Sequence, residues 1–153
     1  VRAFLVRLSR DYNLADDLAQ ETFLTAFQKI DLYRGTGSFS AWLFQVAYNK
    51  FLEQKRRDKR RDEINKQMQS DFEPQADRYQ SMNDVQYDLE AAMAKISPEQ
   101  AAAITLCHSY GYSHREAAEI LDMPVGTVKT HIARGKELLR SQLGTDFQLG
   151  ETG

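Results

Sequence analysis

Two helix-start signals in the second half of the chain constrain its fold most strongly. Residues 97–100 read SPEQ and residues 113–116 read SHRE, and each run is a capping box. In such a box the serine side chain accepts from the amide three residues on, and the Gln or Glu side chain accepts from the serine amide. Gly111 is expected to end the first helix, and residues 122–124 to end the second. We therefore predict two short helices and a last helix over about 125–143.

Apolar residues in the first half of the chain also recur at helical spacing. One apolar face predicts a first helix over residues 1–10, and Asp16 or Asp17 is expected to cap a second. Residues 33–38 break the pattern and predict a loop, after which a third helix is expected over about 40–57. The apolar residues that carry this pattern are Phe4, Leu5, Leu8, Leu18, Phe23, Ala26, Phe27, Ile30, Trp42, Leu43, Val46 and Ala47, the last four of which are expected to be buried.

The residues from 58 to about 83 show no apolar periodicity and are rich in Gln, Asp, Glu and Arg, so they predict a linker. Gly and Pro are scarce, with 8 and 3 among 153 residues, and this favours helices over a turn-rich β fold. The predicted fold is all-α, with two small helical domains joined by a flexible linker. Their bounds are 1–57 for the first domain, 58–84 for the linker, 85–143 for the second domain and 144–153 for a tail.

Composition restricts the class of protein. Hydrophobic residues make up 42% and charged residues 27%, as in soluble globular domains. No apolar run approaches the roughly 20 residues of a membrane span, so we expect no membrane insertion. Cys107 is the only cysteine, which excludes an internal disulfide and fits a reducing cytosol, so a cytoplasmic location is expected. We interpret its thiol as a small buried apolar group.

Charge is strongly segregated, although the formal net charge is only −2. The segment from Lys50 to Arg61 contains seven basic residues and two acidic ones. Residues 62–99 carry nine acidic and three basic residues, and residues 129–140 are basic again. Two basic patches separated by an acidic stretch predict two contacts with a polyanion and a spacer between them. Solvated helix faces remain the alternative.

The last two predicted helices have the shape of a helix-turn-helix. Ala117 and Ala118 are small, as the first helix requires where the second crosses it closely. The second helix can bury one apolar stripe and expose a polar arc, whose hydroxyls and long cations suit phosphates and base edges. That arc holds Thr127, Lys129, Thr130, His131, Arg134 and Lys136. A helical hairpin that merely packs remains the alternative.

Residues 112–129 (YSHREAAEILDMPVGTVK) closely resemble the promoter-binding region 4 of extracytoplasmic-function (ECF) sigma factors. The run PVGTVK is among the most specific signatures of that family. The resemblance implies that this domain reads the −35 promoter element, with Lys129, Thr130, His131 and Arg134 facing DNA. Asp122 stands where many relatives carry glycine, and Asp tolerates a left-handed conformation better than most residues.

Asp17 and Glu21 lie one turn apart on a predicted helix. An enzyme could use them as metal ligands or as an acid–base pair, and a helix start also favours carboxylates. No second acidic cluster or Gly-rich loop accompanies them, and the nearest histidine in sequence is His108. We therefore predict no catalytic residue, no metal and no cofactor. Residues 16–23 resemble the sigma region 2 helix that docks on the polymerase β′ clamp, which implies that Asp17, Gln20 and Glu21 contact that clamp.

Residues 33–43 (YRGTGSFSAWL) resemble the promoter-melting loop of the same family and the helix after it. Melting requires a base to leave the stack, and aromatic rings beside a flexible loop and a cationic track suit that task. Phe39 and Trp42 are expected to lie in the core. The resemblance assigns the flipped base of the −10 element to Tyr33, Gly35, Thr36, Gly37, Ser38 and Asn49, and its phosphates to Lys50, Lys55, Arg56 and Arg57.

Residues and resemblance together predict a sigma factor rather than an enzyme. It would bind core RNA polymerase through the β′ clamp, recognise −35 and −10 promoter DNA and promote melting, and relatives imply an anti-sigma factor as a further partner. Two interpretations stay open. One is a sigma-like mimic that binds an anti-sigma factor without DNA, against which the basic residues of the last helix count. The other is a two-domain regulator that needs no polymerase, which residues 17–21 oppose.

Overall fold

The computed structural model describes residues 1–35, 37–68 and 91–143, and every regular element in this part of the chain is helical. The elements are α1 (Arg2–Ser9), α2 (Tyr12–Gln28), the 3-10 turn η1 (Ile30–Leu32), α3 (Phe39–Met68), α5 (Pro98–Ile104), the π-helical η2 (Thr105–Ser109), α6 (His114–Leu121) and α7 (Val125–Leu143). The prediction of an all-α fold is confirmed. Most of the predicted linker and the whole predicted tail lie outside the described residues. None of the described helices is long and apolar enough to cross a bilayer.

The start of α2 differs from the prediction that Asp16 or Asp17 caps it. Asp11 is the cap, and its side chain accepts from the Leu14 amide at 3.0 Å. Arg10 ends α1 in the left-handed conformation (φ 57°), which turns the chain within two residues. Asp16 lies further along α2, where it pairs with Arg2 of α1.

The buried face of α2 consists mainly of small residues, and Leu18 is its one large apolar side chain. Phe27 is 80% exposed, Phe23 54% and Ile30 45%, although their spacing had placed them in one apolar repeat. Leu18 and Ala26 of that repeat are buried as predicted, and Ala15, Ala19 and Thr22 are buried with them. Small side chains allow α2 to lie close to α1 and α3, and the aromatic rings are left on the outer surface.

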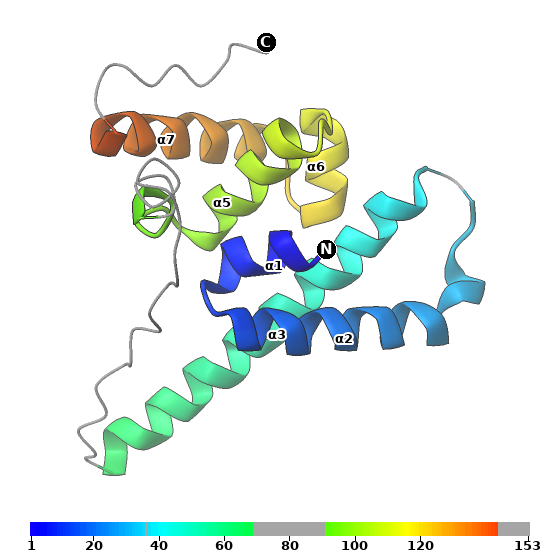
Figure 1. The fold of residues 1–153 in the computed structure, drawn as a ribbon, viewed down its shortest axis with the longest axis horizontal. Helices are drawn as coiled ribbons and strands as arrows, with labels where there is room; N and C mark the ends of the chain where they lie inside the picture. The colour runs from blue at the N-terminus through cyan, green and yellow to red at the C-terminus, as the bar shows by residue number, and fades with distance from the viewer. Residues whose placement is uncertain (36, 69–90, 144–153) are drawn as a thin grey trace.

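Helix α3 begins at Phe39 and continues to Met68, eleven residues beyond its predicted end. Its first half packs in the body of the molecule and its second half projects beyond it (Figure 1). The charge-rich residues after 57 were interpreted as linker because they lack an apolar stripe, but a solvated helix needs none. Bonds between neighbouring turns support it there, such as the one from Gln54 to Asp58 at 3.0 Å.

Both predicted capping boxes are present. Ser97 Oγ accepts from the Gln100 amide and Ser113 Oγ from the Glu116 amide, each at 3.1 Å, and the reciprocal bonds are also made. After α5 the helix widens into the π turn η2 and stops at Gly111, whose φ is 74°. The predicted bounds of α6 and α7 are confirmed.

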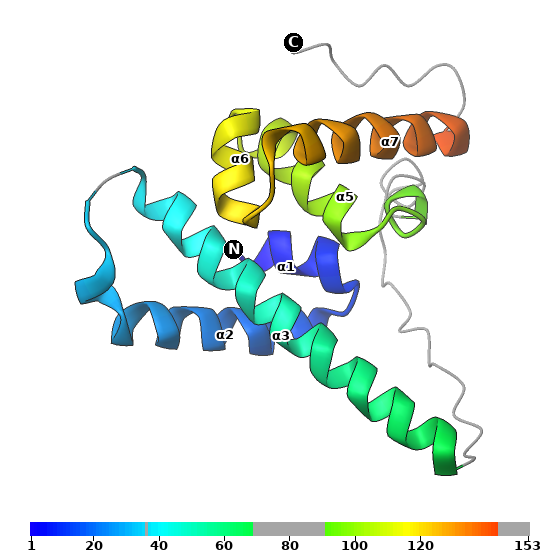
Figure 2. The same cartoon turned by 180° about the vertical axis from the view of Figure 1, so that it is seen from behind.

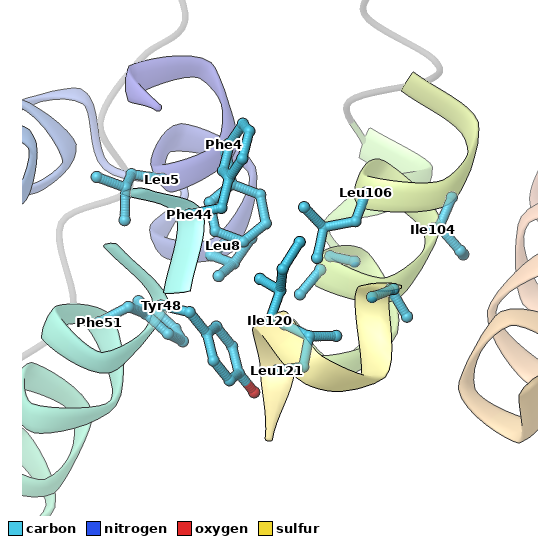
Figure 3. Close-up of a cluster of buried hydrophobic side chains, with 14 of the residues drawn as sticks. Phe4, Leu5, Leu8, Phe44, Tyr48, Phe51, Ile104, Leu106, Ile120 and Leu121 are labelled. Carbon is cyan, nitrogen blue, oxygen red and sulfur yellow. The ribbon is translucent and has the colours of Figure 1, made fainter. Parts of the chain in front are cut away.

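The two expected domains share one continuous core in this structure. α1 packs on α5, and α3 packs on α6 (Figure 2). Phe44 of α3 lies at the centre, with its ring centroid 5.2 Å from that of Phe4 and 4.7 Å from that of Tyr110. Figure 3 shows Leu106, Ile120 and their neighbours turned toward the side chains of the first domain.

Candidate nucleic-acid interface

The turn between α6 and α7 has the geometry of a helix-turn-helix. Asp122 ends α6 in the left-handed conformation (φ 52°, ψ 54°), and its amide donates to the carbonyl oxygens of Ala118 and Glu119. Ala117 and Ala118 of α6 and Val128 of α7 are all buried, and the two helices pack on each other. The close crossing that their small size predicts is therefore present.

The residues of the predicted DNA-facing arc do not all lie on one side of α7. Thr127, Thr130 and Arg134 are exposed and share one face, since they are three and four residues apart. Lys129 is exposed beside them. Thr130 Oγ1 donates to the Gly126 carbonyl at 3.0 Å, so its oxygen is left to accept. This face offers the hydroxyls of Thr127 and Thr130 with the guanidinium of Arg134 between them, and the Lys129 cation follows about 100° from Thr130 around the helix.

His131 and Lys136 border the buried stripe of α7 from opposite sides, and both are half-buried. Their five-residue separation places them about 140° apart around the helix. Lys136 lies near enough to Cys107 and His108 for its charge to lower the pKa of both groups. Lys136 is thus set apart from the exposed face, whereas His131, four residues after Thr127, borders it.

The segment 105–109 holds two titratable groups in partly buried positions. Burial lowers the pKa of His108, and the charges of Lys136 and His114 lower it further. Burial raises the pKa of the Cys107 thiol against the opposing effect of Lys136. Both effects favour the neutral forms. Within the described residues, no group of His, Cys, Asp and Glu side chains is arranged to hold a metal ion.

The loop predicted at residues 33–38 is present, and Thr36 within it lies outside the described residues. Tyr33 Oη donates to the Gly37 carbonyl at 2.9 Å and closes the loop. Gly35 and Gly37 have φ of 70° and 86°, a region that other residues rarely adopt. A Cβ at either position would meet nothing within 4 Å. Glycine is therefore favoured there by the backbone conformation and not by a lack of room for a side chain.

The aromatic residues beside the loop form a cluster of their own. The rings of Tyr33, Phe39 and Trp42 lie 5.4 to 5.7 Å apart. The expectation that Phe39 and Trp42 belong to the core is wrong, because Phe39 is 45% exposed and Trp42 is half-buried. Ser38 Oγ accepts from the Ala41 amide at 3.1 Å and so caps the start of α3.

The buried face of α3 also differs from the prediction. Ala47 is buried as expected, whereas Leu43 and Val46 are only half-buried. The residues buried alongside Ala47 are Phe44, Tyr48 and Phe51. This face lies between α1 and α6, and the aromatic cluster beside the loop lies outside it.

Four of the predicted −10 residues share one side of α3: Asn49, Lys50, Arg56 and Arg57. Asn49 and Arg56 are two turns apart, and so are Lys50 and Arg57. Lys50 Nζ lies 3.6 Å from Glu53 Oε2, and Arg57 Nη2 lies 3.7 Å from the same oxygen. Asn49 and Arg56 are exposed. This side of α3 is therefore a cationic track over residues 49–57, which starts about three turns after the helix begins at Phe39.

Lys55 lies on another side of α3 and pairs with the second domain. Its Nζ is 3.2 Å from Glu99 Oε1 in the first turn of α5. Burial alone would raise the pKa of Glu99, but hydrogen bonds from its own backbone, Lys55 and Ser97, with the charge of Lys55, lower it overall. The ion pair therefore holds Glu99 in its charged form.

The predicted polymerase-binding residues occupy one face of α2. Asp17 and Gln20 are exposed, and Glu21 is half-buried beside them. Leu24 and Phe27, 63% and 80% exposed, continue the same face by helical spacing. We did not predict this apolar part. The signal that could have shown it is the stripe of small residues on the opposite side, which leaves the large residues no core position.

Comparison with known proteins shows which family this chain belongs to. Family models for Sigma-70 region 2 and Sigma-70 region 4 match residues 1–61 and 86–139. The ECF RNA polymerase sigma factor EcfG of Rhodopseudomonas palustris is 32% identical over 147 residues, covering 95% of this chain and 80% of EcfG. The chain belongs to the ECF RNA polymerase sigma factor family.

Other ECF sigma factors show similar agreement. SigW of Bacillus subtilis is 30% identical over 149 residues, which cover 90% of this chain and 79% of SigW. SigE of Mycolicibacterium smegmatis is 34% identical over 144 residues, and the chain spans about half of that relative's length, 54%. The resemblance stated from the motifs is thereby confirmed.

Solved structures agree with the fold. The sigma factor RpoE of Bartonella quintana, crystallised with the anti-sigma factor NepR, matches with a TM-score of 0.79 at 29% identity. The match covers 95% of this chain and 91% of RpoE. CnrH in complex with the cytosolic domain of CnrY matches with a TM-score of 0.61 at 23% identity, which supports the fold.

Proposed function

We propose that this ECF sigma factor binds core RNA polymerase, recognises −35 and −10 promoter elements and promotes DNA melting at the start of transcription. The observation that carries the proposal is the α6–α7 helix-turn-helix, with its left-handed turn at Asp122 and its exposed polar face. Residues 1–57 serve as region 2, 58–84 as the linker and 85–143 as region 4. The first eleven linker residues continue α3 as helix.

The exposed face of α7 reads the −35 element. Arg134 and Lys129 have the length and charge to reach base edges or phosphates from the major groove. Thr127 and Thr130 offer hydroxyls to the backbone or to bases. His131 and Lys136, on the flanks, contact phosphates at most, because both are half-buried.

The loop before α3 handles the −10 element. A base that leaves the stack costs a few kcal/mol, and the cluster of Tyr33, Phe39 and Trp42 offers rings against which it can stack. The resemblance assigns residues 35–38 and Asn49 to the same base, and Gly37 and Ser38 line one cavity with Tyr33 and Trp42. The cationic track of α3 holds the phosphates of the same strand.

Core polymerase docks on the outer face of α2. Asp17, Gln20 and Glu21 present hydrogen-bond acceptors to basic residues of the β′ clamp. Leu24 and Phe27 add an apolar centre, and such a centre with a polar rim is the usual anatomy of a specific interface. The chain acts in the cytoplasm, supplies no catalysis, needs no cofactor and is held inactive by an anti-sigma factor.

Reconstitution tests this function directly. Core polymerase is mixed with the chain on a promoter library, and transcription starts are mapped. We expect defined starts that need the chain and that weaken when Arg134 is replaced by Ala. No chain-dependent start, together with tight binding to an anti-sigma factor, would instead identify a mimic.

A further inference from the structure

The helices of region 4 cover part of region 2 through contacts at widely separated points. Ser40 Oγ lies 2.7 Å from Tyr112 Oη, close in sequence to the loop at residues 33–38, which we call the −10 loop. Arg7 Nη1 donates to Ser109 Oγ at 2.7 Å, and Lys55 pairs with Glu99. These contacts come from α1 and α3 on one side, and from α5, η2 and the turn before α6 on the other.

Between these polar contacts lies an apolar centre. The Phe44 ring lies 4.7 Å from that of Tyr110 and 6.0 Å from that of Tyr112. Leu106 and Ile120 are buried and turn toward Phe44 and its neighbours (Figure 3). An apolar centre inside a polar rim is the composition of a specific interface rather than of a chance contact.

The −10 loop meets α6 across a cavity of about 430 Å³. Tyr33, Arg34 and Trp42 line it from region 2, and Glu116 and Glu119 line it from α6. A nucleotide strand that approached the aromatic cluster would bring its phosphates toward these two carboxylates. The phosphates and the two carboxylates are all negative, so they would repel each other, and more strongly where water is partly excluded.

We propose that the chain silences its own −10 surface when neither DNA nor polymerase is bound. The α5–α6 side of region 4 docks on region 2, and it must leave before the −10 strand can reach the loop. In this closed form Lys55 pairs with Glu99, and in the open form it pairs with a phosphate of the DNA instead. The inference rests on the proposed role of the loop in −10 recognition.

Two measurements on the full chain test this, without polymerase. Small-angle scattering gives its radius of gyration, and fluorescence anisotropy gives its affinity for the single-stranded −10 sequence found in the promoter library. Glu99→Gln removes the ion pair, and Tyr110→Ala removes the ring that packs on Phe44. Glu137→Gln, on the exposed side of α7, is the control of equal charge change.

We expect a compact wild type and an expanded double variant E99Q/Y110A. The affinity for the oligonucleotide should rise about two- to fivefold for Glu99→Gln and more than tenfold for the double variant. The Glu137→Gln control should match wild type in both measurements. Circular dichroism confirms that each variant keeps its helices, and Glu99→Gln alone serves if the double variant does not fold.

Two results would overturn the proposal. One is a wild type that is already expanded, and the other is an expanded variant that binds the oligonucleotide no more tightly than wild type. If no form binds the oligonucleotide at all, while scattering shows closure, the −10 role itself is wrong and the proposal falls with it. That pattern differs from equal, measurable binding by all forms, which counts against the silencing alone.

Discussion

Gly135 of α7 lies so close to α5 that a Cβ at this position would be 2.5 Å from Cδ1 of Ile104. The Cβ of Gln100 would be 3.4 Å away. Because Ile104 is buried, a larger side chain would force either the Ile104 side chain or α7 itself to move. We expect Gly135→Val to lower the free energy of unfolding by about 1–3 kcal/mol. Urea denaturation measures this, and Gly126→Ala, whose Cβ would meet nothing within 4 Å, should not destabilise.

The left-handed turn at Asp122 gives a second stability test. Asp122→Gly should leave the unfolding free energy unchanged or raise it slightly, because glycine adopts φ 52° without a steric penalty. Asp122→Val should lower it by about 1–2 kcal/mol, since a β-branched residue fits this conformation poorly. Thermal melts of the two variants decide the point. Equal melting temperatures would show that the turn relaxes to another conformation.

Stability should also depend on pH through His108. Its pKa is lowered in the folded chain by burial and by the charges of Lys136 and His114, so unfolded chains bind the proton more readily. His108 therefore leaves the free energy of unfolding unchanged above the ordinary histidine pKa of about 6.5, and lowers it as the pH falls below that value. His108→Gln should flatten this decline between about pH 7 and 5. A titration of the His108 ring by NMR checks the direction, and a midpoint above 6.5 would contradict it.

Binding of core polymerase should need both parts of the α2 surface. Asp17→Ala with Glu21→Ala removes the acceptors, and Phe27→Ser removes the most exposed ring. Each should weaken the complex with core polymerase by about tenfold or more while leaving the fold intact. Size-exclusion binding and circular dichroism measure the two effects. Asp62→Ala on the exposed end of α3 is the matched control, and full assembly by the α2 variants would remove this face from the interface.

The exposed face of α7 should matter more for DNA than its flanks. Arg134→Ala is expected to weaken −35 binding by about 1–3 kcal/mol if the side chain reads a base. Lys136→Ala should cost less, because Lys136 is half-buried near Cys107 and His108. Competition binding on duplexes with single base changes separates the two. Equal losses for both variants would mean that α7 lies in the groove in another rotation.

How well sequence predicted structure depended on whether the signal was local. The capping boxes and the turn at Asp122 are local hydrogen-bond patterns, and they were predicted correctly. The cap of α2 was missed because Asp11, Asp16 and Asp17 are the same residue type, and the sequence does not show that Asp11 caps the helix while Asp16 pairs with Arg2. Apolar spacing was weaker still, since on α2 small residues compete with large ones for the same core.

The candidate site showed the same limit. Family motifs assigned residues to promoter elements, but could not show that Lys55 faces another domain while Arg56 faces solvent. Nor did any pattern along the chain indicate that regions 2 and 4 pack together. That information lies in the shapes of two surfaces far apart in sequence.

The π turn η2 has one more consequence. The Tyr110 amide bonds to the Thr105 carbonyl, five residues back, so this turn holds one residue more than an α-helix would. Each residue of an α-helix turns the chain by about 100°. Deleting one residue between 105 and 109 would therefore restore an ordinary α-helical turn, and the Tyr110 side chain would still lie one turn after Thr105, on nearly the same side of the helix. The extra residue therefore marks a point where this helix can gain or lose one residue while Tyr110 stays packed on Phe44.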